Sequence, residues 1–331
     1  MPRASRIVAL AILLLLALPL SNFAIAEWQH AANPVPGAFF SVEGRRMHLY
    51  CSGAGSPTIL IEAGASADWL GWQAVQSTLS SSTRICTYDR AGHGWSQPRS
   101  GPRDAETIVR ELHSLLDQAA IPRPLVLAGH SAGGLYVREY AREFPAEIAG
   151  VILIDSSSPQ QIDELPGWRQ SYEADKRDRP ARILLQRLRV WSGWDRLTGN
   201  CHNEPSPELR NLAAQYDAEM CRPKYVGGED SELPYFETSC RQAARLTTFG
   251  DIPLLVLSRD PSAEHSAGNR VWEQEQESLK QLSPISWRII ARTAGHAVHH
   301  DRLDVIVAET TRLLSYVRRG PAPPWGTTST E

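Results

Sequence analysis

The sequence lacks several features that would assign it to a common class of protein. No long run of one charge sign occurs and the formal net charge is −3, so nothing favours a nucleic-acid partner. No C-x-x-C spacing or histidine cluster indicates a metal, and we expect no cofactor. No internal repeat is visible. These absences leave the chain's own side chains as the source of any chemistry.

The N-terminal apolar run, residues 7–20, is shorter than the roughly 20 residues that span a bilayer. Two arginines precede it, and Ala24-Ile25-Ala26 follows it as an A-x-A site, which is typical of a signal peptide. We expect residues 1–26 to be removed on export, which makes the folded part periplasmic or secreted. A retained N-terminal membrane anchor is the alternative.

The chain has only five cysteines, and an oxidising compartment favours disulfides between them. Cys51 ends one predicted strand and Cys86 lies in another, whereas Cys201, Cys221 and Cys240 share a later segment. We expect one bridge between the first two, one within the later trio, and one cysteine left over. Buried free thiols are the alternative.

Short apolar strands alternate with helical patterns along most of the chain. We predict strands over residues 39–42, 46–51, 58–62, 84–89, 124–128, 150–155, 253–257 and 287–291. The first two flank Glu43-Gly44 as a hairpin, and helices are predicted after Pro102 and over 302–316. Continuous apolar strands between helices are typical of a buried, mostly parallel sheet.

Residues 156–249 break this alternation, because charged residues, prolines and tryptophans are mixed there. We expect an inserted cap that divides a core into 27–155 and 250–318, although the length equally allows two domains. The stretch 182–191 has the pattern of a basic amphipathic helix. We expect its apolar side to face the site, and weak contact with a membrane surface through the cap or the leader is the alternative. Prolines predict a disordered tail over 319–331.

The most informative stretch runs from Pro124 to Leu135: an apolar strand, a G-x-S-x-G turn and the start of a helix. A serine at the tip of so sharp a turn lies in strained backbone, and bulk at Gly129 or Gly133 would collide with neighbouring chain. The strain directs the Ser131 hydroxyl into a cleft. There the Ala132 amide, at the start of the helix, faces a developing oxyanion.

A serine hydroxyl needs a base within hydrogen-bond reach before it can attack a carbonyl at neutral pH. The best candidate is His296, just beyond the last predicted strand, because parallel strands end at the same sheet edge. His299 and His300 are rivals that we expect to be solvated residues at a helix start. We assign the second oxyanion donor to the amide of Ala65, in the loop after the strand at 58–61; an ordinary glycine turn is the alternative.

Together these motifs resemble the serine-nucleophile α/β-hydrolase superfamily, of the esterase or lipase type with a cap, over about residues 38–317. Residues 88–96 are also similar to that family's D-x-x-G-x-G-x-S loop. The resemblance implies the α/β-hydrolase fold: a mostly parallel sheet, helices on both faces and a helical cap after the sixth strand. Within that loop we expect Asp89 and Arg90 to form a structural ion pair and His93 to be a loop residue.

The resemblance also implies the order Ser, acid, His, and here the sequence departs from the pattern. The loop after the seventh predicted strand has Ser262 at the usual acid position, with Asp260 and Glu264 as near matches. Asp155 ends the sixth strand, where the resembling haloalkane dehalogenases and some lipases keep their acid. The acid holds the histidine tautomer and stabilises the imidazolium. Asp155 is the first choice, and Asp260 and Glu264 stay open.

We therefore expect an exported serine hydrolase that cleaves a small carboxylic ester through an acyl-enzyme on Ser131, as a monomer or small homo-oligomer. Amide or lactone hydrolysis and cofactor-free haloperoxidase chemistry would use the same residues. Epoxide hydrolases and dehalogenases need a carboxylate nucleophile, which Ser131 excludes. A non-catalytic binding protein of this fold is the alternative from another class.

Overall fold

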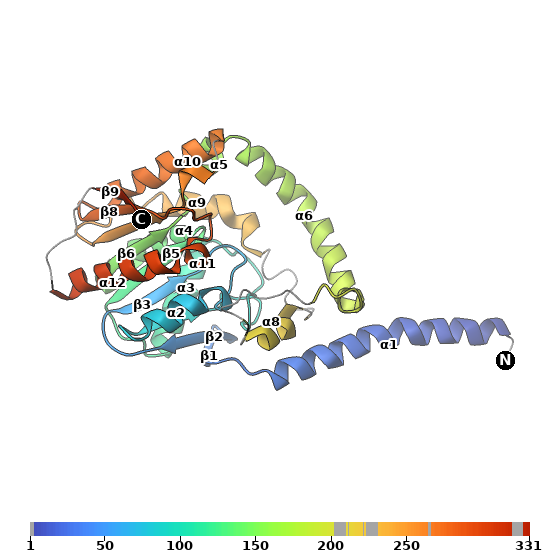
Figure 1. The fold of residues 1–331 in the computed structure, drawn as a ribbon. Coiled ribbons are helices and arrows are strands. Elements are labelled where there is room, and N and C mark those ends of the chain that lie inside the picture. The colour runs from blue at the N-terminus through green and yellow to red at the C-terminus, as the bar shows by residue number, and fades with distance from the viewer. Residues whose placement is uncertain are drawn as a thin grey trace.

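The computed structural model describes residues 3–201, 210, 212–220, 222, 231–263, 266–319 and 327–331. Within them nine strands form one sheet in the order β1-β2-β4-β3-β5-β6-β7-β8-β9 (Figure 1). The strands are β1 (Ala38–Val42), β2 (Arg45–Ser52), β3 (Thr58–Glu62), β4 (Ile85–Tyr88), β5 (Leu125–His130), β6 (Ile148–Ile154), β7 (Leu254–Ser258), β8 (Ser286–Ile290) and β9 (Thr328–Thr330). β2 runs antiparallel to β1 and β4, and all other pairs are parallel. The mostly parallel sheet and the first hairpin are confirmed.

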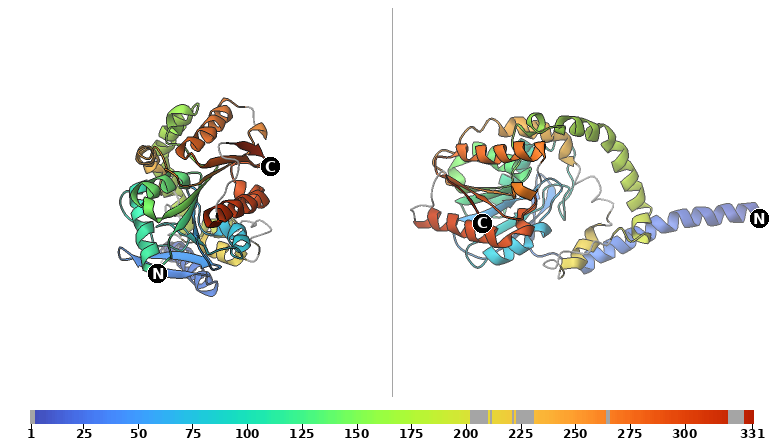
Figure 2. Two further views of the ribbon diagram at one scale, coloured as in Figure 1. Left: turned by 90° about the vertical axis from the view of Figure 1, so that its left-hand side faces the viewer. Right: turned by 45° about the horizontal axis from the view of Figure 1, so that its top comes forward.

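Helices cover both faces of this sheet (Figure 2). The described α-helices are α1 (Arg3–Ala32), α2 (Gln73–Leu79), α3 (Ala105–Gln118), α4 (Gly133–Glu143), α5 (Gln161–Glu164), α6 (Trp168–Trp191), α7 (Trp194–Leu197), α8 (Ala213–Met220), α9 (Phe236–Ala243), α10 (Ala267–Ser278), α11 (Val298–Asp301) and α12 (Leu303–Arg319).

The core consists of two apolar layers, one on each side of the sheet. Every residue of β3, β5 and β7 is buried, which explains why their sequences are continuous apolar runs rather than alternating ones. Leu112 of α3 and Leu135 of α4 belong to one layer, and Leu79 of α2 and Leu313 of α12 belong to the other. The strand ends that carry the candidate site are therefore held from both faces.

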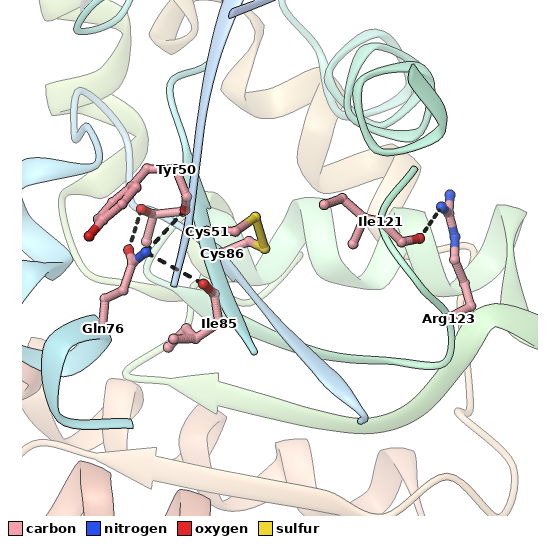
Figure 3. The surroundings of a disulfide bond; sticks show 8 residues. Tyr50, Cys51, Gln76, Ile85, Cys86, Ile121 and Arg123 are labelled. Carbon is pink, nitrogen blue, oxygen red and sulfur yellow. Dashed lines mark hydrogen bonds between the residues drawn. A yellow bond between two sulfur atoms is a disulfide. The ribbon is translucent and has the colours of Figure 1, made fainter. Parts of the chain in front are cut away.

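The disulfide between Cys51 and Cys86 is confirmed: it joins directly paired positions of β2 and β4 (Figure 3). Beside it, the Gln76 side-chain amide donates to the backbone carbonyls of both strands. Of the later trio, Cys201 is disulfide-bonded and Cys240 is a free, buried thiol. Cys221 lies outside the described residues.

The C-terminal end differs from its prediction. We expected disorder from residue 319, yet Thr328–Thr330 form β9 on the sheet edge. The amide of Arg288 donates to the carbonyl of Thr327, and the amide of Glu331 donates to that of Ile290. The Thr328 hydroxyl also accepts from Lys280 and donates to Glu277, each at 2.9 Å. The exposed Thr-Ser-Thr sequence of this strand has no apolar signal that could have predicted it.

Helix α1 extends away from the sheet toward the N-terminus, and it contacts α8 and α6 (Figure 1). It contains the expected cleavage site at Ala24-Ile25-Ala26, whose use stays a prediction. None of the described helices combines the length and the apolar character needed to cross a membrane.

Between β6 and β7 the chain forms helices α5 to α9, and the longest of them, α6, arches away from the sheet (Figure 1). The expectation that the apolar side of residues 182–191 faces the site is wrong. Leu184, Leu188 and Trp191 are 59%, 55% and 61% exposed, whereas Val190 packs near α1. The pattern correctly indicated an amphipathic helix, but periodicity alone does not say what its apolar face covers.

Candidate active site

Ser131 occupies a strained turn between β5 and α4. Its φ is +52°, a left-handed conformation that residues other than glycine rarely adopt. A Cβ on Gly129 would lie 2.8 Å from the Gly133 carbonyl oxygen, and one on Gly133 would lie 2.7 Å from the Ala63 carbonyl oxygen. Both glycines are therefore required by close backbone packing, as a nucleophile elbow requires.

The elbow is tied to the end of β6 by backbone hydrogen bonds. The Ser131 amide donates to the Ile154 carbonyl at 3.2 Å, and the Ser131 carbonyl accepts from the Ser157 amide at 2.9 Å. The serine turn and the carboxylate that follows Ile154 are therefore fixed relative to each other.

His296 lies on the loop after β8 and contacts the carboxylate that directly follows β6. Its Nδ1 is 2.6 Å from Oδ2 of Asp155, which is completely buried. The other carboxylate oxygen accepts from the Trp272 indole N–H at 2.9 Å and from the Arg259 amide at 3.2 Å. Because Nδ1 faces the carboxylate, Nε2 is the ring nitrogen left to act as a base.

Asp260 is engaged elsewhere. One of its oxygens accepts from the amide and the hydroxyl of Ser262, and the other accepts from the Thr293 amide. These bonds, the Ser262 hydroxyl first, lower the pKa of Asp260. Its role in the structure is to join two loops. Glu264, the third candidate, lies outside the described residues.

Three further histidines surround His296. His130, inside the G-x-S-x-G turn, has its Nε2 2.9 Å from the His296 carbonyl oxygen, and burial followed by the nearby His296 lowers its pKa to about 4. We expected a solvated His299, but it is buried and stacks on Trp72 with ring centroids 4.0 Å apart. His300 is exposed, as expected. The sequence analysis missed His130, although its place beside the serine was a usable signal.

Ser131 and His296 line the same pocket, which has a volume of about 360 Å³. Ala65 and Ala132, the two predicted oxyanion donors, also line it. The other described lining residues are Ser157, Gln161, Leu165, Pro166, Trp168, Leu233, Phe236, Arg259, Ser266, Gly268, Asn269 and Trp272. Both the core and the segment between β6 and β7 therefore form the pocket wall.

The predicted ion pair between Asp89 and Arg90 is not formed. Asp89 instead accepts from His48 Nδ1 at 2.9 Å and from the amides of Trp69 and Trp95. Adjacent residues on an extended loop point in different directions, so their opposite charges gave a misleading signal. The hydrogen bonds to the Asp89 carboxylate therefore stabilise the loop in which it lies.

Arg90 instead forms a buried network beneath the Ala65 loop. Its guanidinium bonds Glu62 at 2.8 Å and Glu232 at 2.6 Å, and it donates to the carbonyls of Ala63 and Gly64. Burial would raise the pKa of Glu232, but the charges of Arg90 and other neighbours outweigh burial and lower the pKa to about 2. Arg90 thus joins the segment between β6 and β7 to the loop that leads to Ala65.

His93 is buried in the same region, where desolvation lowers its pKa to about 4. It is not among the described residues that line the pocket. In the described parts of the chain, no group of three or more His, Cys, Asp or Glu side chains is placed to hold a metal ion.

Comparison with known proteins agrees with this architecture. The sequence profile of the alpha/beta hydrolase family matches residues 49–309, so the chain belongs to that family. An uncharacterized Bacillus subtilis protein, YqjL, is 24% identical, with 85% of this chain and 90% of YqjL covered. The human (lyso)-N-acylphosphatidylethanolamine lipase is 23% identical over 74% of this chain and 75% of its own. A thermophilic esterase from Thermogutta terrifontis shares the fold with a TM-score of 0.60 at 20% identity, covering 86% of this chain and 99% of the esterase.

Proposed function

We propose that this hydrolase cleaves a carboxylic ester through an acyl-enzyme on Ser131. One observation carries the proposal: His296, held at Nδ1 by the buried Asp155 carboxylate, lines the same pocket as the Ser131 hydroxyl. An esterase and a lipase among the similar proteins support this substrate class.

In the proposed reaction, His296 Nε2 takes the Ser131 proton while the hydroxyl oxygen attacks the ester carbonyl. The amides of Ala65 and Ala132 stabilise the oxyanion, and each such donor contributes about 3–4 kcal/mol to the transition state. His296 then protonates the departing alcohol. Water, deprotonated by the same nitrogen, then attacks the acyl-enzyme; the bond to the Ser131 oxygen breaks, His296 returns the proton to that oxygen, and the acid is released.

Asp155 stabilises the imidazolium that forms in both steps and keeps the useful tautomer. Its burial and its bonds from Trp272 and the Arg259 amide fix the carboxylate before the substrate arrives.

We also propose export, which the bridge between Cys51 and Cys86 supports, because such bonds persist in oxidising compartments. N-terminal sequencing of secreted protein tests it: we expect a start near Glu27, and an intact leader would contradict removal.

The test of catalysis is hydrolysis of p-nitrophenyl butyrate by the purified protein and by Ser131→Ala. We expect kcat to fall by about 10⁴-fold or more, because the nucleophile is lost. Ser77→Ala, an exposed serine on α2, is the matched control and should keep full activity. A fluorophosphonate should label Ser131 in the wild type, as peptide mass spectrometry can show. Full turnover by Ser131→Ala would refute the mechanism, and a wild type without turnover or labelling would favour a binding protein.

A further inference from the structure

Arg259 is an unusual side chain on the pocket wall. It follows β7 directly, and its side chain is 26% exposed. Its guanidinium lies 4.7 Å from the centre of the Trp272 ring, and its Nε is buried without a hydrogen-bond partner in the described structure. Among the described residues its carboxylate partner is Asp155, whose Oδ2 is 3.8 Å from that Nε and already bonds His296 at 2.6 Å.

A second arginine nearby differs from Arg259 because its guanidinium is fully buried and hydrogen-bonded. Arg288 on β8, the strand next to β7, is buried and donates to Ser258 at 2.8 Å and to Glu273 at 2.8 and 2.6 Å. Arginine stays charged at every physiological pH, and partly buried donors without partners lose their hydration. Each guanidinium nitrogen of Arg288 therefore has an acceptor, whereas the buried Nε of Arg259 has none in the described structure.

The other described lining residues do not supply a charged partner for Arg259. Arg259 is the only Lys, Arg, Asp or Glu among the described lining residues. Ser266, Gly268 and Asn269 also line the pocket, and they form the N-terminal turn of the 12-residue helix α10, whose dipole adds partial positive charge. The described pocket wall thus presents positive potential beside the proposed ester site, and the one described carboxylate within 4.0 Å of Arg259 is Asp155, which already bonds His296.

We propose that the substrate is an ester with an anionic group, a carboxylate or a phosphate, which Arg259 binds while Ser131 attacks the ester carbonyl. The planar guanidinium matches either oxyanion through two parallel hydrogen bonds, and Trp272 supports its flat face. The apolar residues on the pocket wall, such as Leu165 and Phe236, take the carbon chain. This inference rests on the proposed function.

The test compares two esters of equal chain length, the 4-nitrophenyl half-ester of glutarate and 4-nitrophenyl valerate. We expect the wild type to have a kcat/KM about tenfold or more higher for the anionic ester. Arg259→Gln should reduce that ratio about tenfold, and Arg259→Lys should restore part of it. Arg292→Gln, an exposed arginine that does not line the pocket, should leave the ratio unchanged.

Competition on the wild type keeps the test independent of how well the variants fold. Glutarate and glycerol 3-phosphate are each added during valerate hydrolysis, and inhibition by one of them identifies the preferred oxyanion. The proposal is overturned if the wild type does not prefer the anionic ester and neither anion competes. It is also overturned if Arg259→Gln lowers kcat/KM equally for both esters, because Arg259 would then act only through Asp155. Failure of the proposed function looks different: neither ester would depend on Ser131.

Discussion

The sheet core and the segment between β6 and β7 contribute to the candidate active site in different ways. In the core, Ser131, Asp155 and His296 follow three parallel strands whose residues are almost completely buried, so their positions are fixed from two sides. The segment between β6 and β7 contributes Leu165, Trp168 and Phe236 to the pocket, yet much of α6 is exposed. In the proposed reaction the reacting groups therefore come from the well-packed core, whereas the pocket wall that contacts the substrate comes from both regions, with Arg259 from the core and Leu165, Trp168 and Phe236 from the other segment.

The largest expected effect tests the core. Asp155→Asn should lower kcat by about 10³- to 10⁴-fold, because an amide favours the wrong histidine tautomer and cannot stabilise the imidazolium. Asp260→Asn should lower kcat only a few-fold, since its bonds join loops. Rates with p-nitrophenyl butyrate at pH 7, together with the melting temperature of each variant, separate catalysis from stability. A large loss in Asp260→Asn alone would assign the acid to the other loop.

The sequence predicted the core well because its signals are local. The apolar run before Ser131 gave β5 within a residue or two, and the glycine spacing gave the turn. It left Asp155 and Asp260 open because both follow parallel strands, and only side-chain direction separates them. The pairing of Arg90 with Glu232 was invisible, since the two lie 142 positions apart and tertiary packing brings them together.

Glu232 is where the two regions are joined, and its loss should have an intermediate effect. Glu232→Gln removes the buried negative charge that faces Arg90, Arg103 and His93. We expect a loss of about 2–4 kcal/mol in the free energy of unfolding, measured with urea at pH 7. Glu237→Gln, whose partners Arg169 and Arg241 are exposed, should cost less than about 1 kcal/mol.

The effect of Glu232 on the free energy of unfolding should also depend on pH, in a direction that its pKa sets. The folded-state pKa of Glu232, about 2, lies below its ordinary value of 4.5, so its stabilising contribution is complete above pH 4.5 and is lost as the pH falls toward 2. The stability difference between wild type and Glu232→Gln should therefore shrink over that window. Because Glu232 also raises the pKa of the neighbouring His93, the comparison is made in a His93→Gln background, where that second titration is absent. An unchanged difference down to pH 2 would contradict this account of the charge.

The smallest expected effect concerns the exposed face of α6. That helix carries seven Lys or Arg against three Asp or Glu, and Leu184, Leu188 and Trp191 are more than half exposed. A basic helix with an uncovered apolar face favours weak binding to anionic lipid surfaces. We expect the protein to co-sediment with phosphatidylglycerol vesicles, and the triple change to serine at these positions to reduce binding several-fold while hydrolysis of p-nitrophenyl butyrate stays unchanged. Phe39→Ser, an exposed aromatic on β1, is the control. Equal binding by the triple variant would place any lipid contact elsewhere and leave the exposed face of α6 without a lipid partner.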